Sequence, residues 1–278
     1  QALVKRLPGE HHLLFADIDG TFPNHHPDPT VEANLVDLRR LVADKKLDFG
    51  VAFDGDADRV GAIDGEGRVV WGDQLLSILA EPVLKELPGS TIIADVKASQ
   101  ALYDRIAELG GTPLMWKTGH SLIKAKMKEV DSPLAGEMSG HIFFKHRWYG
   151  FDDGMYAAAR FLALMDRYDA TADALMEHMP PSCSTPELFI AVSEAEKFTL
   201  MQRIKEALTF NDAQVSLLDG VRADFDHGWG LIRASNTTPV LVLRFEGHTE
   251  SALHRIEHDM LTLLKTVKPD ASLQSAAH

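Results

Sequence analysis

Hydrophobic and polar residues alternate along the first 170 residues in a pattern that predicts strands and helices in turn. Short apolar runs predict strands at residues 13–16, 49–53, 69–70, 91–96, 113–116 and 142–144. Apolar residues at helical spacing predict helices at residues 32–44, 73–87, 99–109, 121–130 and 152–168. The connections are short, and polar or glycine-rich loops follow several strand ends. This order is typical of a layered α/β domain whose strands are mostly parallel.

The pattern changes after a proline-rich stretch at residues 180–186. Beyond this stretch, strands are predicted at residues 188–192, 215–218, 228–232 and 240–245, with helices at residues 194–208 and 250–267. Successive strands joined by polar loops favour antiparallel pairing. We therefore expect a second, smaller α+β domain of roughly the usual minimum size.

The composition excludes several classes of function. The chain has 278 residues and a formal net charge of −13. This charge argues against a nucleic acid or an anionic membrane as partner, because both need a basic face. A small phosphorylated ligand stays compatible, since it needs only a local positive pocket. The single cysteine, Cys183, excludes an internal disulfide and favours the reducing cytoplasm.

The most informative motif is an acidic run directly after the strand predicted at residues 49–53. Asp54, Asp56 and Asp58 alternate with two small residues. Three carboxylates this close repel one another unless a cation neutralises them, and hard divalent ions prefer such oxygen ligands. Arg59 follows at once and suits an anionic group beside the metal. We favour a metal loop over the alternative of a solvated acidic turn.

Two glycines bracket a second polar loop at residues 136–141. Within it, Glu137, Ser139 and His141 bring together a carboxylate, a hydroxyl and an imidazole. Glu137 and Ser139 could hydrogen-bond the hydroxyls of a sugar, and His141 could move a proton or hold a phosphate. A structural turn that caps a strand carries equal weight as an explanation of this spacing.

A third polar loop, at residues 233–239, lies between two predicted strands of the smaller domain. Arg233 is followed by Ser235, Asn236 and two threonines. A guanidinium beside hydroxyl, amide and backbone N–H groups suits a phosphate, whereas a hydrophilic hairpin loop is the plain alternative. Lys97 and the segment at residues 117–121 also stand at strand ends. Their cationic and helix-start groups favour an anion or a polar ligand.

In this order and spacing, three motifs resemble those of the α-D-phosphohexomutases, above all the bacterial phosphomannomutase/phosphoglucomutase branch. The motifs are Asp54-Gly-Asp-Ala-Asp-Arg59, Gly136-Glu-Met-Ser-Gly-His141 and Arg233-Ala-Ser-Asn-Thr-Thr-Pro239. The resemblance implies layered α/β domains with mixed sheets, followed by the smaller α+β C-terminal domain. It implies three functional parts: the end of a metal-binding domain 2 at residues 1–68, a sugar-binding domain 3 at residues 69–181, and a phosphate-binding domain 4 at residues 182–278.

The resemblance also implies a reaction and a role for each motif. Phosphohexomutases interconvert hexose 1-phosphates and 6-phosphates through a phosphoserine and a 1,6-bisphosphate, and this branch acts on glucose or mannose phosphates. By resemblance, Mg²⁺ would be held by Asp54, Asp56 and Asp58. Arg59 and His141 would take part in catalysis. The residues that would bind the substrate are Lys97, His120, Glu137, Ser139, His141, Arg233, Ser235, Asn236 and Thr237.

The family's serine loop, Thr-Ala-Ser-His-Asn-Pro, does not occur in this sequence. Residues 3–9 also read as the end of a helix. Both observations predict a chain that lacks the N-terminal domain, its covalent partner in the full-length enzyme, and that is inactive without it. The alternative is a non-catalytic module that binds sugar phosphates. A third interpretation, a phosphatase of the haloacid-dehalogenase type, rests on Asp17-Ile-Asp-Gly-Thr21, but Phe22-Pro-Asn24 does not continue that motif into a helix.

Overall fold

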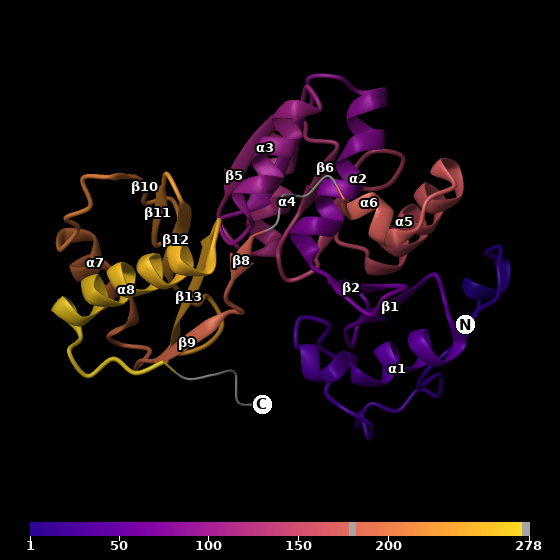
Figure 1. Ribbon diagram of the computed structural model, residues 1–278, viewed down its shortest axis with the longest axis horizontal. Helices are drawn as coiled ribbons and strands as arrows, with labels where there is room; N and C mark the ends of the chain where they lie inside the picture. Colours follow the sequence, from indigo (N-terminus) through magenta and orange to yellow (C-terminus); the bar gives the residue numbers. More distant parts are fainter. Residues whose placement is uncertain (178–181, 274–278) are drawn as a thin grey trace.

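The computed structural model describes residues 1–177 and 182–273, which form three sheets with helices packed against them (Figure 1). The first sheet is antiparallel, with the strand order β1-β2-β3. Its strands are β1 (Phe49–Phe53), β2 (Val60–Asp64) and β3 (Val69–Val70). The helical segments before it are η1 (Val4–Arg6), η2 (Glu32–Leu35) and α1 (Val36–Lys45). The acidic motif occupies the turn between β1 and β2.

The second sheet has the strand order β5-β4-β6-β7, in which the first three strands are parallel and β7 is antiparallel to β6. Its strands are β4 (Thr91–Asp95), β5 (Thr112–Trp116), β6 (Leu134–Gly136) and β7 (Ile142–Phe144). The helices around it are α2 (Gly72–Glu86), α3 (Gln100–Glu108), α4 (His120–Val130), α5 (Gly154–Tyr168) and α6 (Ala172–Met176).

Alternate residues of β4 explain why helices cover both faces of this sheet, since successive side chains of a strand point to opposite sides. Ile92 and Ala94 belong to the large hydrophobic core that α2, α3 and α5 share. Ile93 instead packs with Ile123 and Met127 of α4. The sheet is therefore buried on both faces, and its strand ends are left to carry polar loops.

The third sheet has the strand order β10-β11-β12-β13-β8, and β9 also pairs with β13; every pairing is antiparallel. Its strands are β8 (Cys183–Ser184), β9 (Leu188–Ala191), β10 (Ala213–Ser216), β11 (Val221–Phe225), β12 (Gly228–Ala234) and β13 (Val240–Gly247). Two helices, α7 (Lys197–Glu206) and α8 (Glu250–Val267), close its core. Figure 1 shows this C-terminal unit lying to one side of the other two sheets.

Two buried arginines join the C-terminal sheet to the end of β4. Arg222 of β11 donates to the carbonyls of Val96 and Ala98 at 2.8 and 2.9 Å. Arg244 of β13 donates to the carbonyl of Lys97. Buried charges are costly unless they are hydrogen-bonded, so these contacts hold the C-terminal unit against the second sheet.

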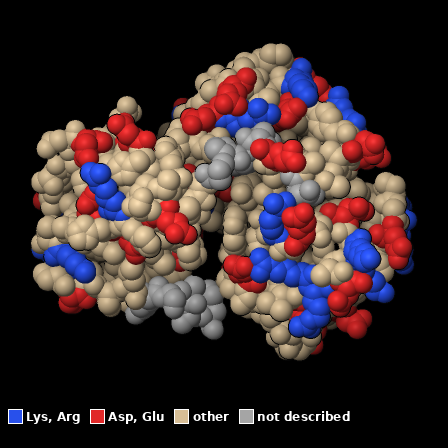
Figure 2. All heavy atoms as spheres, viewed as in Figure 1, with Lys and Arg blue, Asp and Glu red and all other residues tan. Residues whose placement is uncertain are grey.

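The surface carries both signs of charge. On the face drawn in Figure 2, acidic and basic side chains are interspersed, and the surface is hollowed between the C-terminal unit and the rest of the molecule. Within the described residues, every helix is too short or too polar to cross a membrane.

The fold confirms the predicted class, which is layered α/β with mixed sheets followed by a smaller α+β unit. The expectation of mostly parallel strands holds only for β4, β5 and β6, because hairpins connect β1 to β3. The strand predicted at residues 13–16 is wrong. Leu13 and Phe15 are exposed there, and the segment pairs with no described strand. Pro180 and Pro181 of the predicted boundary lie outside the described residues.

Candidate active site

The acidic motif forms a tight turn that gathers its three carboxylates. The ligand atoms of Asp54, Asp56 and Asp58 lie within 4.8 Å of one another. Ala57 has a φ of +63°, in the left-handed region that non-glycine residues rarely adopt. Its carbonyl accepts a hydrogen bond from the Gly154 N–H at 3.1 Å, which ties the turn to the start of α5. This left-handed residue therefore lies between Asp56 and Asp58, in the turn that brings the three carboxylates together.

The charges in this turn are only partly compensated. Burial would raise the pKa of Asp54, but hydrogen bonds from the Arg59 backbone N–H and Nε, at 3.0 and 2.7 Å, hold it below its ordinary value. Asp58 behaves differently. Burial, together with the neighbouring Asp54 and Asp56 carboxylates, raises its pKa, although His141 opposes the shift. A divalent cation would relieve the repulsion at Asp58, so this set of three carboxylates fits a hard metal ion.

A second group of possible metal ligands overlaps the first. One ligand atom each from Asp58, His141 and Asp152 lies within the same 4.8 Å. The ring nitrogens of His141 contact Ser139 at 2.9 Å and Asp58 at 3.3 Å. Because the imidazole already has these partners, the set of three aspartates fits a magnesium-like ion better than the set that contains His141.

The guanidinium of Arg59 is more engaged than the sequence indicates. Besides its bonds to Asp54, it donates through Nη1 to Asp28 at 3.2 Å. Asp28 also accepts hydrogen bonds from the backbone N–H and the hydroxyl of Thr30. The sequence does not reveal this contact between Asp28 and Arg59, which spans 31 positions. That Arg59 contacts the substrate stays a prediction.

Backbone hydrogen bonds join the acidic turn to the loop at residues 136–141. The Val60 N–H donates to the Gly140 carbonyl at 3.0 Å, and Arg59 forms a β-bridge with His141. Gly140 has a φ of +93°, and an added Cβ would lie 2.5 Å from the Val60 carbonyl oxygen. Glycine is required here because two backbones meet, so the two motifs are adjacent in the structure.

Glu137, Ser139 and His141 form a hydrogen-bonded set. The Nδ1 atom of His141 lies 2.9 Å from the Ser139 hydroxyl and 3.2 Å from the Glu137 carboxylate. Burial alone would lower the pKa of His141, but Glu137 and Asp58 raise it above its ordinary value. Burial would likewise raise the pKa of Glu137, which the His141 and Gly119 contacts hold low. The Glu137 carboxylate thus stabilises the protonated form of the His141 imidazole.

The segment at residues 117–121 contacts Glu137 directly. The Gly119 N–H donates to one Glu137 oxygen. The Thr118 hydroxyl donates to Asp95 at 2.9 Å. Asp95 is fully buried at the end of β4, and this burial raises its pKa to about 6. The structure therefore adds a buried carboxylate that the sequence analysis did not identify.

His120 and Lys97 each have an acidic partner that the sequence analysis missed. Asp152 accepts from His120 Nδ1 at 3.0 Å and from Lys124 at 2.8 Å. Lys97, which is almost fully buried, donates to Glu187 at 2.6 Å. Burial would lower the pKa of Lys97, but Glu187 and Asp95 raise it, so the side chain is an ammonium ion.

The loop at residues 233–239 is built around Ser235 and Arg233. The Ser235 hydroxyl contacts the Thr238 hydroxyl at 2.8 Å and accepts from the Thr237 and Thr238 N–H groups. Arg233 is buried and donates through Nε to Asp219 at 3.0 Å. Its Nη2 atom is buried and has no hydrogen-bond partner. An unpartnered guanidinium nitrogen at this point fits an anionic ligand.

Side-chain contacts connect this loop to the rest of the candidate site. Asn236 donates through Nδ2 to the Thr118 carbonyl at 3.0 Å. Asp219, which holds Arg233, also accepts from the Thr118 N–H at 3.0 Å. Contacts therefore run without a break from the acidic turn through His141 and Glu137 to Gly119 and Thr118, and on to the third loop. The structure brings together all the residues predicted for the site.

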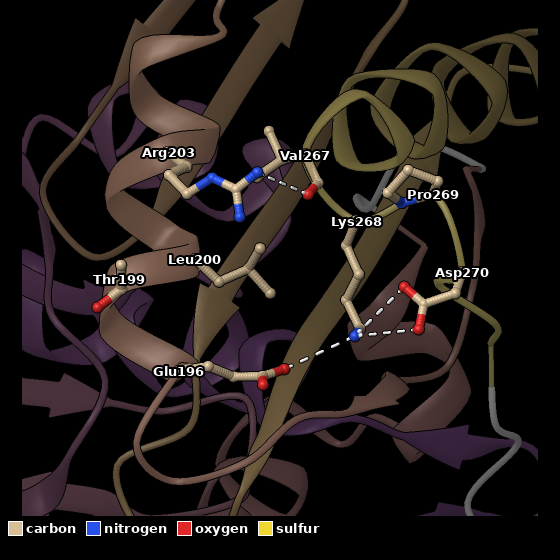
Figure 3. Close-up of a pocket in the computed structure, with 8 residues that line it drawn as sticks. All are labelled: Glu196, Thr199, Leu200, Arg203, Val267, Lys268, Pro269 and Asp270. Carbon is tan, nitrogen blue, oxygen red and sulfur yellow. Dashed lines mark hydrogen bonds and ion pairs between the residues drawn. The ribbon is translucent and has the colours of Figure 1, made fainter.

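Two other features lie apart from these loops. A cavity of about 270 Å³ lies between α7 and the end of α8 (Figure 3). Its Arg203 donates to the Val267 carbonyl, and its Lys268 pairs with Glu196 and Asp270. Both cations of this cavity are therefore already engaged. The phosphatase-like string at residues 17–21 is exposed, with Asp19 capping its own turn through Thr21, and this does not favour a catalytic role.

Comparison with known proteins identifies the family of the chain. Three family models match the chain: phosphoglucomutase/phosphomannomutase alpha/beta/alpha domain II at residues 1–67, alpha/beta/alpha domain III at residues 71–182, and the C-terminal domain at residues 187–263. The fold is that of the phosphohexomutases, and the chain belongs to the phosphoglucomutase/phosphomannomutase family.

Individual relatives give the same answer. A phosphomannomutase/phosphoglucomutase from Pseudomonas syringae pv. tomato is 51% identical over 98% of this chain and 58% of its own length. A phosphoglucomutase from Neisseria meningitidis serogroup A is 45% identical over 95% of this chain and 58% of its own length. A crystal structure of a family protein from Burkholderia thailandensis superposes with a TM-score of 0.87 at 48% identity, over 94% of this chain and 56% of that one. The chain thus spans less than two thirds of each.

Proposed function

We propose that this chain is the metal-, sugar- and phosphate-binding part of a phosphohexomutase that interconverts hexose 1-phosphates and 6-phosphates. Glucose and mannose phosphates are the proposed substrates, with the 1,6-bisphosphate as intermediate. The observation that carries the proposal is the unbroken chain of contacts from the acidic turn, through His141 and Glu137, to Arg233. A hexose bisphosphate needs this combination: a cation site at one phosphate, hydroxyl partners in the middle and a cationic pocket at the other phosphate.

At the metal end, Asp54, Asp56 and Asp58 would hold Mg²⁺. The ion, when bound, neutralises negative charge on the phosphoryl group being transferred. Arg59 keeps Asp54 ionised and oriented, since it donates two hydrogen bonds to it. His141 would give a proton to a sugar oxygen, and its contacts with Glu137 and Asp58 favour the protonated imidazole that this step needs.

In the middle, Glu137 and Ser139 would bind sugar hydroxyls. Each Glu137 oxygen already accepts one hydrogen bond, and an ionised carboxylate has about four lone-pair sites, so acceptor capacity remains. His120 and Lys97 would contribute donors beside them. The acidic partners of these two residues, Asp152 and Glu187, keep them oriented until the ligand binds.

At the far end, the phosphate that does not react would be bound by Arg233, Ser235, Asn236 and Thr237. Arg233 supports this role because its Nη2 atom is buried and unpartnered. We further propose that residues 1–68, 69–181 and 182–278 act as the metal, sugar and phosphate units. The phosphoserine would come from a further domain of the cytoplasmic enzyme, because this sequence has no Thr-Ala-Ser-His-Asn-Pro loop.

Calorimetric titration of the chain tests the binding part of this proposal. We expect Mg²⁺ to bind, and glucose 1-phosphate and mannose 1-phosphate to bind with heat that Arg233→Ala abolishes. Asp56→Ala should weaken Mg²⁺ binding about tenfold or more, because one of three oxygen ligands is lost. Asp44→Ala, an exposed carboxylate of α1, is the matched control and should leave both titrations unchanged. Absence of heat with every hexose phosphate, with and without Mg²⁺, would overturn the proposal.

The alternative of a non-catalytic module makes a different prediction about turnover. If the chain belongs to a mutase, adding the separately produced N-terminal part of the Pseudomonas syringae relative should restore conversion of glucose 1-phosphate to glucose 6-phosphate. A binding module would take up the ligand and give no conversion under the same conditions. A coupled assay for glucose 6-phosphate separates these outcomes.

A further inference from the structure

Thr118 is hydrogen-bonded both to the second sheet and to the C-terminal unit. Its hydroxyl donates to Asp95 of the second sheet at 2.9 Å. Its backbone is hydrogen-bonded instead to the C-terminal unit. The N–H donates to Asp219 at 3.0 Å, and the carbonyl accepts from Asn236 at 3.0 Å. The next N–H, of Gly119, donates to Glu137. One short loop is thus hydrogen-bonded at the same time to the proposed sugar carboxylate and to the proposed phosphate loop.

Asp219 is hydrogen-bonded to both Thr118 and Arg233. The same oxygen, Oδ2, accepts from the Thr118 N–H and from Arg233 Nε, each at 3.0 Å. Nε of Arg233 is thus occupied by Asp219, while Nη2 of the same guanidinium is buried without a partner. Asp219 therefore sets the direction in which Arg233 presents its charge.

The turn that carries Asp219 is built for this close approach. Gly220 follows with a φ of +94°, and an added Cβ would lie 2.3 Å from the Ile232 carbonyl and 2.7 Å from the Arg233 Cα. Only glycine allows the turn between β10 and β11 to press against the end of β12. The position of Asp219 is thus fixed by backbone packing rather than by the two hydrogen bonds alone.

We propose that Asp219 is a positioning residue that aims Arg233 at the phosphate and couples phosphate binding in the C-terminal unit to the order of the loop at residues 116–121. The inference rests on the proposed function, because it assumes that Arg233 binds phosphate. When an anion engages Arg233, the guanidinium is held in place and Asp219 with it. The Thr118 N–H then keeps its acceptor, and the Gly119–Glu137 contact next to it is stabilised.

Two measurements on the whole chain test this coupling, with inorganic phosphate as the probe. Calorimetry gives the phosphate affinity, and amide hydrogen exchange read by mass spectrometry gives the protection of residues 116–121. In the unaltered chain, phosphate should bind and should slow exchange in this segment. Asp219→Ala should weaken phosphate binding roughly tenfold, as expected for loss of a charge-assisted hydrogen bond, and should abolish the phosphate-dependent protection. Asp226→Ala, an exposed aspartate in the next turn of the same sheet, should change neither.

A double variant shows whether Asp219 acts through Arg233. Asp219→Ala combined with Arg233→Ala should bind phosphate no more weakly than Arg233→Ala alone. The reason is that Asp219 acts only by orienting the Arg233 side chain, which both variants lack. Asp219→Asn keeps an acceptor oxygen in place. It should recover most of the loop protection and part of the affinity, which also tests the inference if the alanine variant fails to fold.

The outcomes separate the two proposals. If the unaltered chain binds neither hexose phosphates nor inorganic phosphate, the proposed function fails, and this inference fails with it. If it binds hexose phosphates but not inorganic phosphate, only this inference is overturned. If the chain binds phosphate and Arg233→Ala loses it, but Asp219→Ala binds normally, only the role of Asp219 is overturned. Additive losses in the double variant, or phosphate binding without any protection of residues 116–121, also overturn that role.

Discussion

The acidic turn and the loop at residues 233–239 are attached to the molecule in opposite ways. The acidic turn is held by backbone: Val60 donates to Gly140, and Gly154 donates to Ala57. The other loop is joined to the candidate site by side chains. Its Asn236 donates to Thr118, and Asp219, in the turn between β10 and β11, accepts from both Thr118 and Arg233 of the loop. The first arrangement contains an excess of negative charge and the second a buried guanidinium nitrogen with no partner.

This difference indicates which half of the site is preformed. A turn built into a β-bridge cannot move without breaking backbone hydrogen bonds, so the carboxylates are gathered before any cation arrives. A loop joined by two side-chain hydrogen bonds can separate from its partner at a smaller cost, since a net hydrogen bond contributes about 1 kcal/mol. We therefore expect the metal end to be rigid and the phosphate end to be adjustable.

The largest effect is expected from disturbing the backbone contact of the acidic turn, which tests whether this turn is held by its backbone. Gly140→Ala should lower the free energy of unfolding by about 4 kcal/mol, because it combines a strained φ with a Cβ 2.5 Å from the Val60 carbonyl oxygen. Gly67→Ala is the matched control: its φ is +84° and an added Cβ meets nothing within 4 Å. It should cost about 1 kcal/mol. Equal losses in scanning calorimetry would contradict the backbone argument.

The attachment of the C-terminal unit can be weakened through its buried arginine. Arg222→Met should destabilise the chain by about 3 kcal/mol, because the carbonyls of Val96 and Ala98 lose their donor and the contact with the Trp229 ring, now 4.1 Å away, is lost. The exposed Arg255→Met serves as control and should cost less than about 0.5 kcal/mol. A calorimetric transition of the C-terminal core that does not move in Arg222→Met would contradict this account.

The buried carboxylate beside Thr118 gives a smaller, pH-dependent effect. Burial raises the pKa of Asp95 to about 6, above its ordinary value of 3.8, so the folded chain holds this proton after the unfolded chain has released it. Its contribution to stability is therefore full below about pH 4 and is lost as the pH rises to about 6. Asp95→Asn removes this loss. From pH 4 to 7, the free energy of unfolding of the variant should fall by about 2 kcal/mol less than that of the unaltered chain.

The exposed Asp104→Asn is the control for this measurement and should follow the pH profile of the unaltered chain. Urea unfolding at several pH values provides the data. Parallel profiles for the unaltered chain and Asp95→Asn would show that this carboxylate titrates normally.

Much of the fold follows from local pattern. Helix α8 begins and ends where apolar spacing predicts, at Glu250 and Val267, and β1 occupies its predicted range. Strand β11 was missed because Arg222 and Asp224 alternate with apolar residues and read as surface. In the structure Arg222 is buried at the boundary between units, where carbonyls of another sheet accept its hydrogen bonds. The pattern of hydrophobic and polar residues alone predicts that an arginine faces the solvent.

In the candidate site, too, local sequence predicts some features and tertiary contacts decide the others. The three motifs are contiguous in sequence, so their residue types and spacing identify them. Their partners are distant: Asp219 is 101 positions from Thr118, and Glu187 is 90 positions from Lys97. An isolated aspartate or glutamate gives no signal of such a contact. The geometry at Asp95 and Asp152 likewise comes from tertiary packing, which brings a strand end and a helix start beside the loops.

The hydrogen bonds that hold Thr118 on two sides determine which substitutions position 118 tolerates. The C-terminal unit holds only main-chain atoms there, and every residue except proline supplies the same N–H and carbonyl. The demand for a particular side chain comes from Asp95, which needs a hydroxyl within reach. Serine meets both requirements. Valine, with the same shape as threonine, would leave the boundary between the units intact and deprive a buried carboxylate of its donor.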